Sequence, residues 1–217
     1  MNFKIIYHSI EKPRLEKQLV DAYQNDNYKK VITLFKQLLE NDPQNEMLRA
    51  NLAIMYYETG ALYLSLSTFS EISEDLGYMA NALDPFSLYV LGKLLKDCNM
   101  FDEALNILSK AINKANNDKD HPKENILNAY KIIITITIIK KDQQSFNDFL
   151  SKAMQYMKKN GLKNRQLTAF SLMTNKGKSS ADIMDSSIVL SPKRTHGNPI
   201  FTADIDIAQR SHSNTIN

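Results

Sequence analysis

Apolar residues recur along this chain three or four positions apart, in blocks separated by short polar turns. In the segment from residue 12 to residue 45, this spacing predicts two amphipathic helices joined at Asp26-Asn27. The apolar positions are Leu15, Leu19 and Ala22 on the first helix and Tyr28, Val31, Phe35, Leu38 and Leu39 on the second. Pro43 opposes further helix because it lacks a backbone N–H group. The segment is therefore predicted to form a helical hairpin.

The same hairpin pattern returns three more times, first after 34 residues. A period near 34 residues is typical of helical repeat proteins. The predicted repeats cover residues 12–45, 46–79, 85–118 and 127–160, with turns at Asp26-Asn27, Gly60, Asn99 and Lys141-Asp142. Five additional residues before the third repeat fall in the sequence SEDLGYMANALD, which either lengthens the preceding helix or forms a loop. The sequence NDKDHPKE predicts a loop before the fourth repeat.

The run IIITITII from Ile132 to Ile139 is the strongest candidate for a strand, because β-branched residues at this density favour a strand by propensity. The repeat region has no second run of similar strength to pair with such a strand. Apolar residues on every side also suit a helix packed between neighbours. We therefore predict a helix here.

Several blocks carry the residues of a known repeat. Leu91-Gly92 with Ala104, Leu52-Ala53-Tyr56 with Phe69, and Phe35 with Pro43 resemble the tetratricopeptide repeat. The resemblance covers residues 12–160 and departs from the pattern at Gln18, at Gly77 and in the fourth block, which has no Leu-Gly pair. It implies an all-α fold, an α-solenoid of antiparallel helix hairpins. The alternative is an unrelated bundle of helical hairpins.

The ends of the chain fall outside the repeat pattern. Residues 1–11 are predicted to be an N-terminal extension, and residues 161–175 a helix that caps the last repeat. Residues 176–217 are rich in Ser, Asn, Asp and Thr and are predicted to be a disordered tail. The tail is either inert or carries short docking motifs at its apolar positions. We also hypothesise that residues 203–207, Ala-Asp-Ile-Asp-Ile, occupy a binding groove of their own or a neighbouring chain.

Composition narrows the classes of function. The charge balance of 27 Lys+Arg against 24 Asp+Glu is too small to indicate a nucleic acid or a membrane surface as partner. The longest uncharged apolar run, between Lys131 and Lys140, is far shorter than a transmembrane helix. Cys98 is the single cysteine, which excludes an internal disulfide and fits the cytoplasmic location that we expect.

The sequence offers no pattern that indicates catalysis. The four histidines are scattered without a partner at helical spacing, and the six glycines form no phosphate-binding string. We therefore predict no catalytic residue, cofactor or metal site, and a protein that is not an enzyme.

The implied solenoid would present the first helix of each repeat on a concave groove. The residues expected there are Val20, Tyr23, Ile54, Tyr57, Phe86, Tyr89, Lys93, Lys96 and Lys131. Aromatic contacts followed by lysines predict a peptide ligand with apolar anchors and acidic residues. In the alternative, some of these side chains pack inside the superhelix. Val20 and Ile54 stand where the family's carboxylate clamp would have Asn, which argues against such a clamp.

The sequence is compatible with two functions. The first is a non-catalytic adaptor or chaperone-like module that binds a partner segment in the groove. The second is a regulatory or assembly subunit that self-associates into a homo-oligomer or docks on a larger complex through its convex face or its tail.

Overall fold

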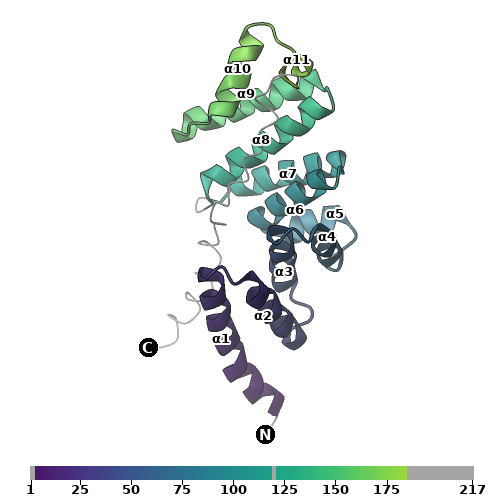
Figure 1. The fold of residues 1–217 in the computed structure, drawn as a ribbon, viewed down its shortest axis with the longest axis vertical. Coiled ribbons are helices and arrows are strands. Elements are labelled where there is room, and N and C mark those ends of the chain that lie inside the picture. Colours follow the sequence, from purple (N-terminus) through teal and green to yellow (C-terminus); the bar gives the residue numbers. More distant parts are fainter. Residues whose placement is uncertain (1–2, 119–120, 185–217) are drawn as a thin grey trace. The chain divides into compact units, whose positions relative to one another are not determined.

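A computed structural model describes residues 3–118 and 121–184, and their regular secondary structure is entirely helical (Figure 1). The prediction of an all-α fold built from helix hairpins is confirmed. Contacts divide the chain into two compact units, Met1–Ile107 and Leu108–Asn217. The helices of the first unit are α1 (Phe3–Gln24), α2 (Tyr28–Asn41), α3 (Glu46–Glu58), α4 (Leu62–Ser70), α5 (Leu76–Ala82) and α6 (Pro85–Asp97). Helix α7 (Phe101–Asn116) begins in the first unit and ends in the second.

The turn inside each hairpin contains one residue with a left-handed backbone. These residues are Asp26, Gly60, Asn99 and Lys141, with φ of 53°, 80°, 61° and 55°. Gly60 follows Asp26 by 34 positions, Asn99 follows Gly60 by 39, and Lys141 follows Asn99 by 42. These are the spacings that the hydrophobic pattern predicts. Glycine adopts this conformation without steric cost, and asparagine and aspartate with little, so Gly60, Asn99 and Asp26 suit the turn geometry and Lys141 does not.

Short polar side chains start most of the helices by accepting hydrogen bonds from free backbone N–H groups. Asn27, Asn45, Asp142 and Asn164 each accept one bond from the residue three positions later, at 3.0 to 3.2 Å. Asp84 accepts two such bonds at the start of α6, where Pro85 occupies the first turn. A cap of this kind contributes about 1 kcal/mol, so the caps fix the helix boundaries locally.

Small residues allow the helices of the second hairpin to approach closely. Ala53 and Ser65 are completely buried, and the Ser65 hydroxyl donates to the Ala53 carbonyl at 2.7 Å. Helix α3 also packs against α2 and α6. It therefore lies at the centre of the first unit.

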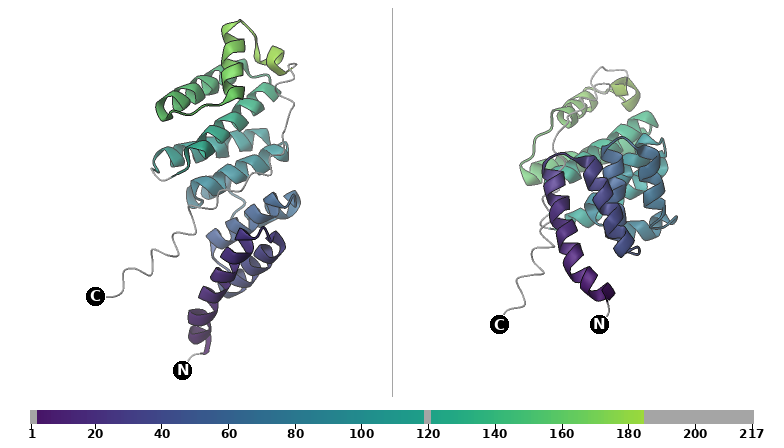
Figure 2. Two further views of the ribbon diagram at one scale, coloured as in Figure 1. Left: turned by 60° about the vertical axis from the view of Figure 1, so that its left-hand side comes forward. Right: turned by 60° about the horizontal axis from the view of Figure 1, so that its bottom comes forward.

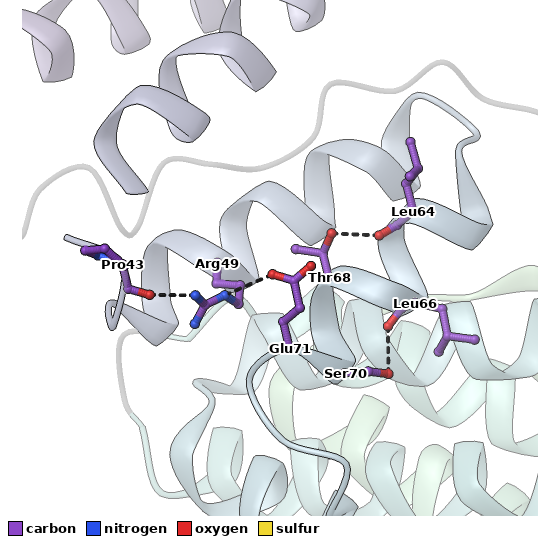
Figure 3. A network of polar contacts seen from close by, with 7 residues as sticks. All are labelled: Pro43, Arg49, Leu64, Leu66, Thr68, Ser70 and Glu71. Atoms are coloured by element: carbon purple, nitrogen blue, oxygen red, sulfur yellow. Dashed lines mark hydrogen bonds and ion pairs between the residues drawn. The ribbon is translucent and has the colours of Figure 1, made fainter. Parts of the chain in front are cut away.

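Arg49 ties the ends of this hairpin together (Figure 3). Its Nη2 donates to the Pro43 carbonyl at 2.5 Å, before α3, and its Nε lies 3.4 Å from Glu71 Oε2, after α4. The arginine side chain is 17% exposed and that of Glu71 is 61% exposed. Arg49 thus joins the segments on which α3 begins and α4 ends.

The structure differs from the sequence prediction at three places in the chain. The additional residues before the third repeat neither lengthen α4 nor form a loop alone, because α5 is a separate helix with buried Met79 and Ala80. Helix α1 begins at Phe3, so the predicted extension of residues 1–11 is largely part of the first helix. Residues 176–184, predicted to be tail, include helix α11 (Ser180–Met184).

The second unit contains α8 (Lys123–Ile139), α9 (Gln143–Asn160), α10 (Arg165–Asn175) and α11 (Ser180–Met184) (Figure 2). The isoleucine run lies in α8, so the prediction of a helix is confirmed. Its consecutive residues Ile133 and Ile134 are both completely buried, whereas neighbouring residues of a strand point to opposite faces. Helix α10 packs on α9, and α11 packs on α8.

Helix α11 is held by apolar and polar contacts. Ile183 is completely buried, and the backbone N–H of Ser180 donates to Gln143 Oε1 at 2.5 Å. The prediction of a disordered tail is therefore wrong for residues 180–184. Residues 185–217, including the apolar positions and the Ala203–Ile207 segment, lie outside the described residues.

Candidate functional site

Side chains of two first helices, α3 and α6, form one surface of the first unit. We call this the first-helix surface and define it by Tyr57, Phe86, Tyr89, Lys93, Lys96 and Asp97. Phe86, Tyr89, Lys93 and Lys96 follow one another at intervals of three or four residues, so they share one face of α6. All four side chains are partly exposed, as is that of Tyr57. Packing of α3 against α6 brings Tyr57 to the same place.

Lys93 connects the two helices through aromatic rings. Its Nζ lies 4.8 Å from the centroid of the Tyr57 ring and 5.5 Å from that of Tyr89. The Tyr89 ring in turn lies 6.3 Å from that of Phe86. A cation at such distances from a ring face is attracted by about 0.5–2 kcal/mol, depending on its exposure. The ammonium group is therefore held in place between two repeats.

Asp97 completes this arrangement at the end of α6. The Tyr57 hydroxyl donates to Asp97 Oδ2 at 2.7 Å, and Lys96 Nζ donates to Oδ1 of the same carboxylate at 2.9 Å. The bond from Tyr57 joins residues 40 positions apart in the sequence. Asp97 thus fixes the orientation of the Tyr57 phenol and partly neutralises Lys96.

Burial of the phenols is the main electrostatic feature of the first-helix surface. Burial raises the pKa of Tyr89 to about 12, and the carboxylate of Glu58 acts in the same direction. Burial also raises the pKa of Tyr57, helped by the hydrogen bond to Asp97 and by that carboxylate's charge. Both phenols therefore stay neutral at physiological pH and serve as hydrogen-bond donors and apolar surface.

A second aromatic pair belongs to the first hairpin. The rings of Tyr23 and Tyr28 lie 6.3 Å apart, and the Tyr28 hydroxyl donates to Asp26 Oδ1 at 3.0 Å. Burial raises the pKa of Tyr23, and the charges of Tyr28, Glu58 and Asp26 add to this effect. Glu58, exposed at the end of α3, therefore lies within electrostatic reach of both aromatic pairs.

The predicted groove residues divide into three sets. The first set lies together on the first-helix surface and consists of Tyr57, Phe86, Tyr89, Lys93 and Lys96. Tyr23 lies on α1, where burial and the charge of Glu58 raise the pKa of its phenol. Val20 is partly exposed on α1, and Lys131 is partly exposed on α8 in the second unit. Ile54 is completely buried in the core around α3, so its expected place on a binding surface is corrected.

Sequence reasoning missed the two carboxylates of this region, Glu58 and Asp97. An isolated acidic residue near a helix end is typical of a solvated surface, so neither position stands out in the sequence. Asp97 becomes recognisable only when α3 and α6 pack together. Its position directly after Lys96 was the single available signal.

Within residues 3–118 and 121–184, no group of three or more His, Cys, Asp or Glu side chains is arranged to hold a metal ion. No described helix is both long enough and apolar enough to cross a membrane.

Comparison with known proteins gives a result for the fold. No family model matches the sequence, and no curated protein matches it. The solved structure of the putative kinesin light chain nearly identical TPR-like repeats from Podospora anserina aligns with a TM-score of 0.51 and 13% identity. It covers 76% of this chain and 81% of that chain. The fold is tetratricopeptide-like.

A second group of structures agrees with this conclusion. MamA 41-end from Desulfovibrio magneticus RS-1 aligns with a TM-score of 0.53 and 16% identity, over 67% of this chain and 75% of that chain. A double mutant of MamA RS-1 aligns with a TM-score of 0.54 over the same shares. At 16% identity, the similarity to MamA concerns the fold alone.

Proposed function

We propose that this chain is a non-catalytic protein-interaction module, an adaptor or chaperone-like protein that binds a partner segment along the first helices of its repeats. The observation that carries the proposal is the position of Lys93 between the rings of Tyr57 and Tyr89. Tetratricopeptide-like repeats present their first helices for binding, and rigid aromatic side chains give large contact area at small entropic cost. The expected location remains the cytoplasm.

The chemistry of the surface supports a ligand with apolar anchors and acidic residues. Phe86 and Tyr89 supply a partly exposed aromatic surface at 6.3 Å ring separation. Lys93 contacts aromatic rings and has no carboxylate partner among the described residues, so its charge is available to an acidic ligand group. Lys96 contributes less, because Asp97 already pairs with it.

A second candidate function follows from the second helix of the second repeat. Tyr63 and Leu64 on α4 are 82% and 46% exposed, and α4 contains no charged residue. Such a surface favours the alternative of an assembly or regulatory subunit that docks through its second helices.

A capture experiment with the full chain as bait separates the two functions. The variant Tyr57→Ala/Tyr89→Ala removes the aromatic rings around Lys93, and Tyr63→Ala/Leu64→Ala is its matched control on α4. We expect partners captured from the native cell lysate to be lost with the first variant and kept with the second. Circular dichroism of both variants checks that the helices remain folded.

The opposite pattern would reject the proposal. Partners that depend on Tyr63 and Leu64, and not on Tyr57 and Tyr89, would assign binding to α4 and support the assembly subunit.

A further inference from the structure

A shallow groove with apolar and polar lining lies between α9 and α10 in the second unit. It consists of two adjoining cavities of about 530 and 560 Å³, both lined by Met154 and Lys158. Its apolar lining comes from Leu150, Met154, Met157, Leu162, Ala169 and Leu172. Leu172 is 57% exposed, which is unusual for a large apolar side chain. Helix α10, which packs on the last hairpin, therefore leaves apolar side chains of the groove exposed.

All charged residues that line the groove are basic. They are Lys158 from α9, Lys163 from the connecting loop, and Arg165 from the start of α10. No Asp or Glu lines either cavity. A lining that contains apolar, uncharged polar and basic side chains and no acidic one favours an occupant that combines apolar and acidic residues.

The chain itself contains a segment of this chemistry beyond the described residues. Between residues 185 and 217 the acidic residues are Asp185, Asp204 and Asp206. Two of them fall in residues 199–208, with the sequence PIFTADIDIA, which has four large apolar residues and no basic one. The preceding segment, residues 186–198, has Lys193 and Arg194 and no acidic residue, so the basic residues of the groove would repel it.

The length of the chain allows the segment to reach the groove. Residue 199 follows Met184, the end of α11, by 15 positions, which can span up to about 50 Å when extended. Helix α9 has 18 residues and is therefore about 27 Å long. A tether of this kind gives an effective concentration in the millimolar range, so even weak binding would fill the groove.

We propose that residues 199–208 of the chain bind in the groove between α9 and α10 and complete the cap of the last hairpin. Apolar side chains of the segment cover Leu172 and Met154, and Asp204 and Asp206 face Lys158, Lys163 and Arg165. The groove is thus occupied by the chain's own C-terminal part and is distinct from the partner-binding surface of the first unit.

Hydrogen–deuterium exchange of the full chain tests this assignment. Because only the unbound population exchanges, a millimolar effective concentration and a Kd of about 0.1 mM leave about a tenth of the segment free and give about tenfold slowing. We expect residues 199–208 to exchange about tenfold more slowly than residues 211–217. Equal rates in the two segments would overturn the proposal.

Matched variants identify the groove as the binding site. Lys158→Glu reverses a charge in both cavities, whereas Lys159→Glu makes the same change in the same helical turn and lines neither. We expect the first variant to abolish the slowing and the second to leave it. Asp204→Lys/Asp206→Lys should abolish it too, and combining this change with Lys158→Glu should restore it in part.

Two further outcomes would contradict the proposal. Equal effects of Lys158→Glu and Lys159→Glu would show that the groove is not the site. Slowing that increases with protein concentration would assign the segment to the groove of a second copy.

Discussion

At the scale of single residues, the first-helix surface depends on the partners of a few charged groups. Lys93 lies against two phenol rings, and Tyr57 donates to Asp97. Both interactions join α3 to α6, so they stabilise the contact between repeats as well as shaping the surface. A ligand carboxylate that approaches Lys93 would meet an ammonium group already oriented by the fold, which reduces the entropic cost of binding.

The raised pKa of Tyr89 leads to a prediction about stability at high pH. Its phenol has a pKa of about 12 in the folded chain, against about 10 in the unfolded chain. As pH rises, the unfolded chain therefore loses this proton before the folded chain does. The contribution of the Tyr89 phenol to the free energy of unfolding is complete below pH 10 and is lost as pH rises through 12. The ceiling of the loss is about 2.7 kcal/mol, at 1.36 kcal/mol for each pKa unit.

Urea titrations from pH 9 to pH 12 measure this effect. We expect the free energy of unfolding of Tyr89→Phe to fall less steeply above pH 10 than that of the unchanged chain. The control is the difference in free energy of unfolding between the two proteins at pH 7, measured separately. The Tyr89 phenol is neutral there, so this difference reports only packing. Parallel curves above pH 10 would show that Tyr89 titrates normally in the folded chain.

At the scale of elements, the hairpin turns explain why the repeats begin and end where they do. Each turn inside a hairpin needs one left-handed residue, and the chain meets this need with Asp26, Gly60, Asn99 and Lys141. Lysine is the least suited of the four, because its Cβ crowds the backbone and, unlike Asp and Asn, it has no short polar side chain that hydrogen-bonds locally. The fourth hairpin therefore carries local strain that the second, with Gly60, does not.

The strain at Lys141 predicts a stabilising substitution. With φ of 55° at this position, Lys141→Gly should raise the free energy of unfolding by up to about 1 kcal/mol. Lys140→Gly is the matched control, because Lys140 has a right-handed helical backbone with φ of −74° and glycine there should be destabilising. Urea denaturation followed by circular dichroism measures both. A loss of stability in both variants would contradict the argument.

The sequence predicts the hairpins well because periodicity and turn residues are local signals. The turns at Gly60 and Asn99 and the helix around Ile133 follow directly from them. Helix α5 has only seven residues, too few for the pattern to separate it from a longer α4 or a loop. Helix α11 depends on its contact with α8, and five residues give no periodicity by themselves.

The candidate site was less predictable for a geometric reason. Ile54 and Tyr57 are three positions apart, yet one is completely buried and the other partly exposed. Core and surface differ by one step around a helix, and the rotation of α3 is set by packing against α2, α4 and α6. The partnership of Tyr57 with Asp97 also crosses 40 residues, which no local pattern can show.

At the scale of the whole molecule, the two proposed binding activities belong to different units. Each unit has its own buried core, around α3 in the first and α8 in the second. Partner binding is proposed for the first unit, and binding of residues 199–208 for the second. Repeat proteins are stabilised mainly by contacts between neighbouring repeats, so substitutions in one surface should leave the other folded and testable.

Site-specific photo-crosslinking in the native cell shows which helices contact the partner. A benzophenone amino acid is placed in the full chain either at Lys96, partly exposed on α6, or at Tyr63, 82% exposed on α4. We expect a partner protein to be cross-linked from position 96 and not from position 63. Cross-linking from position 63 alone would contradict it and would place the partner on the second helices.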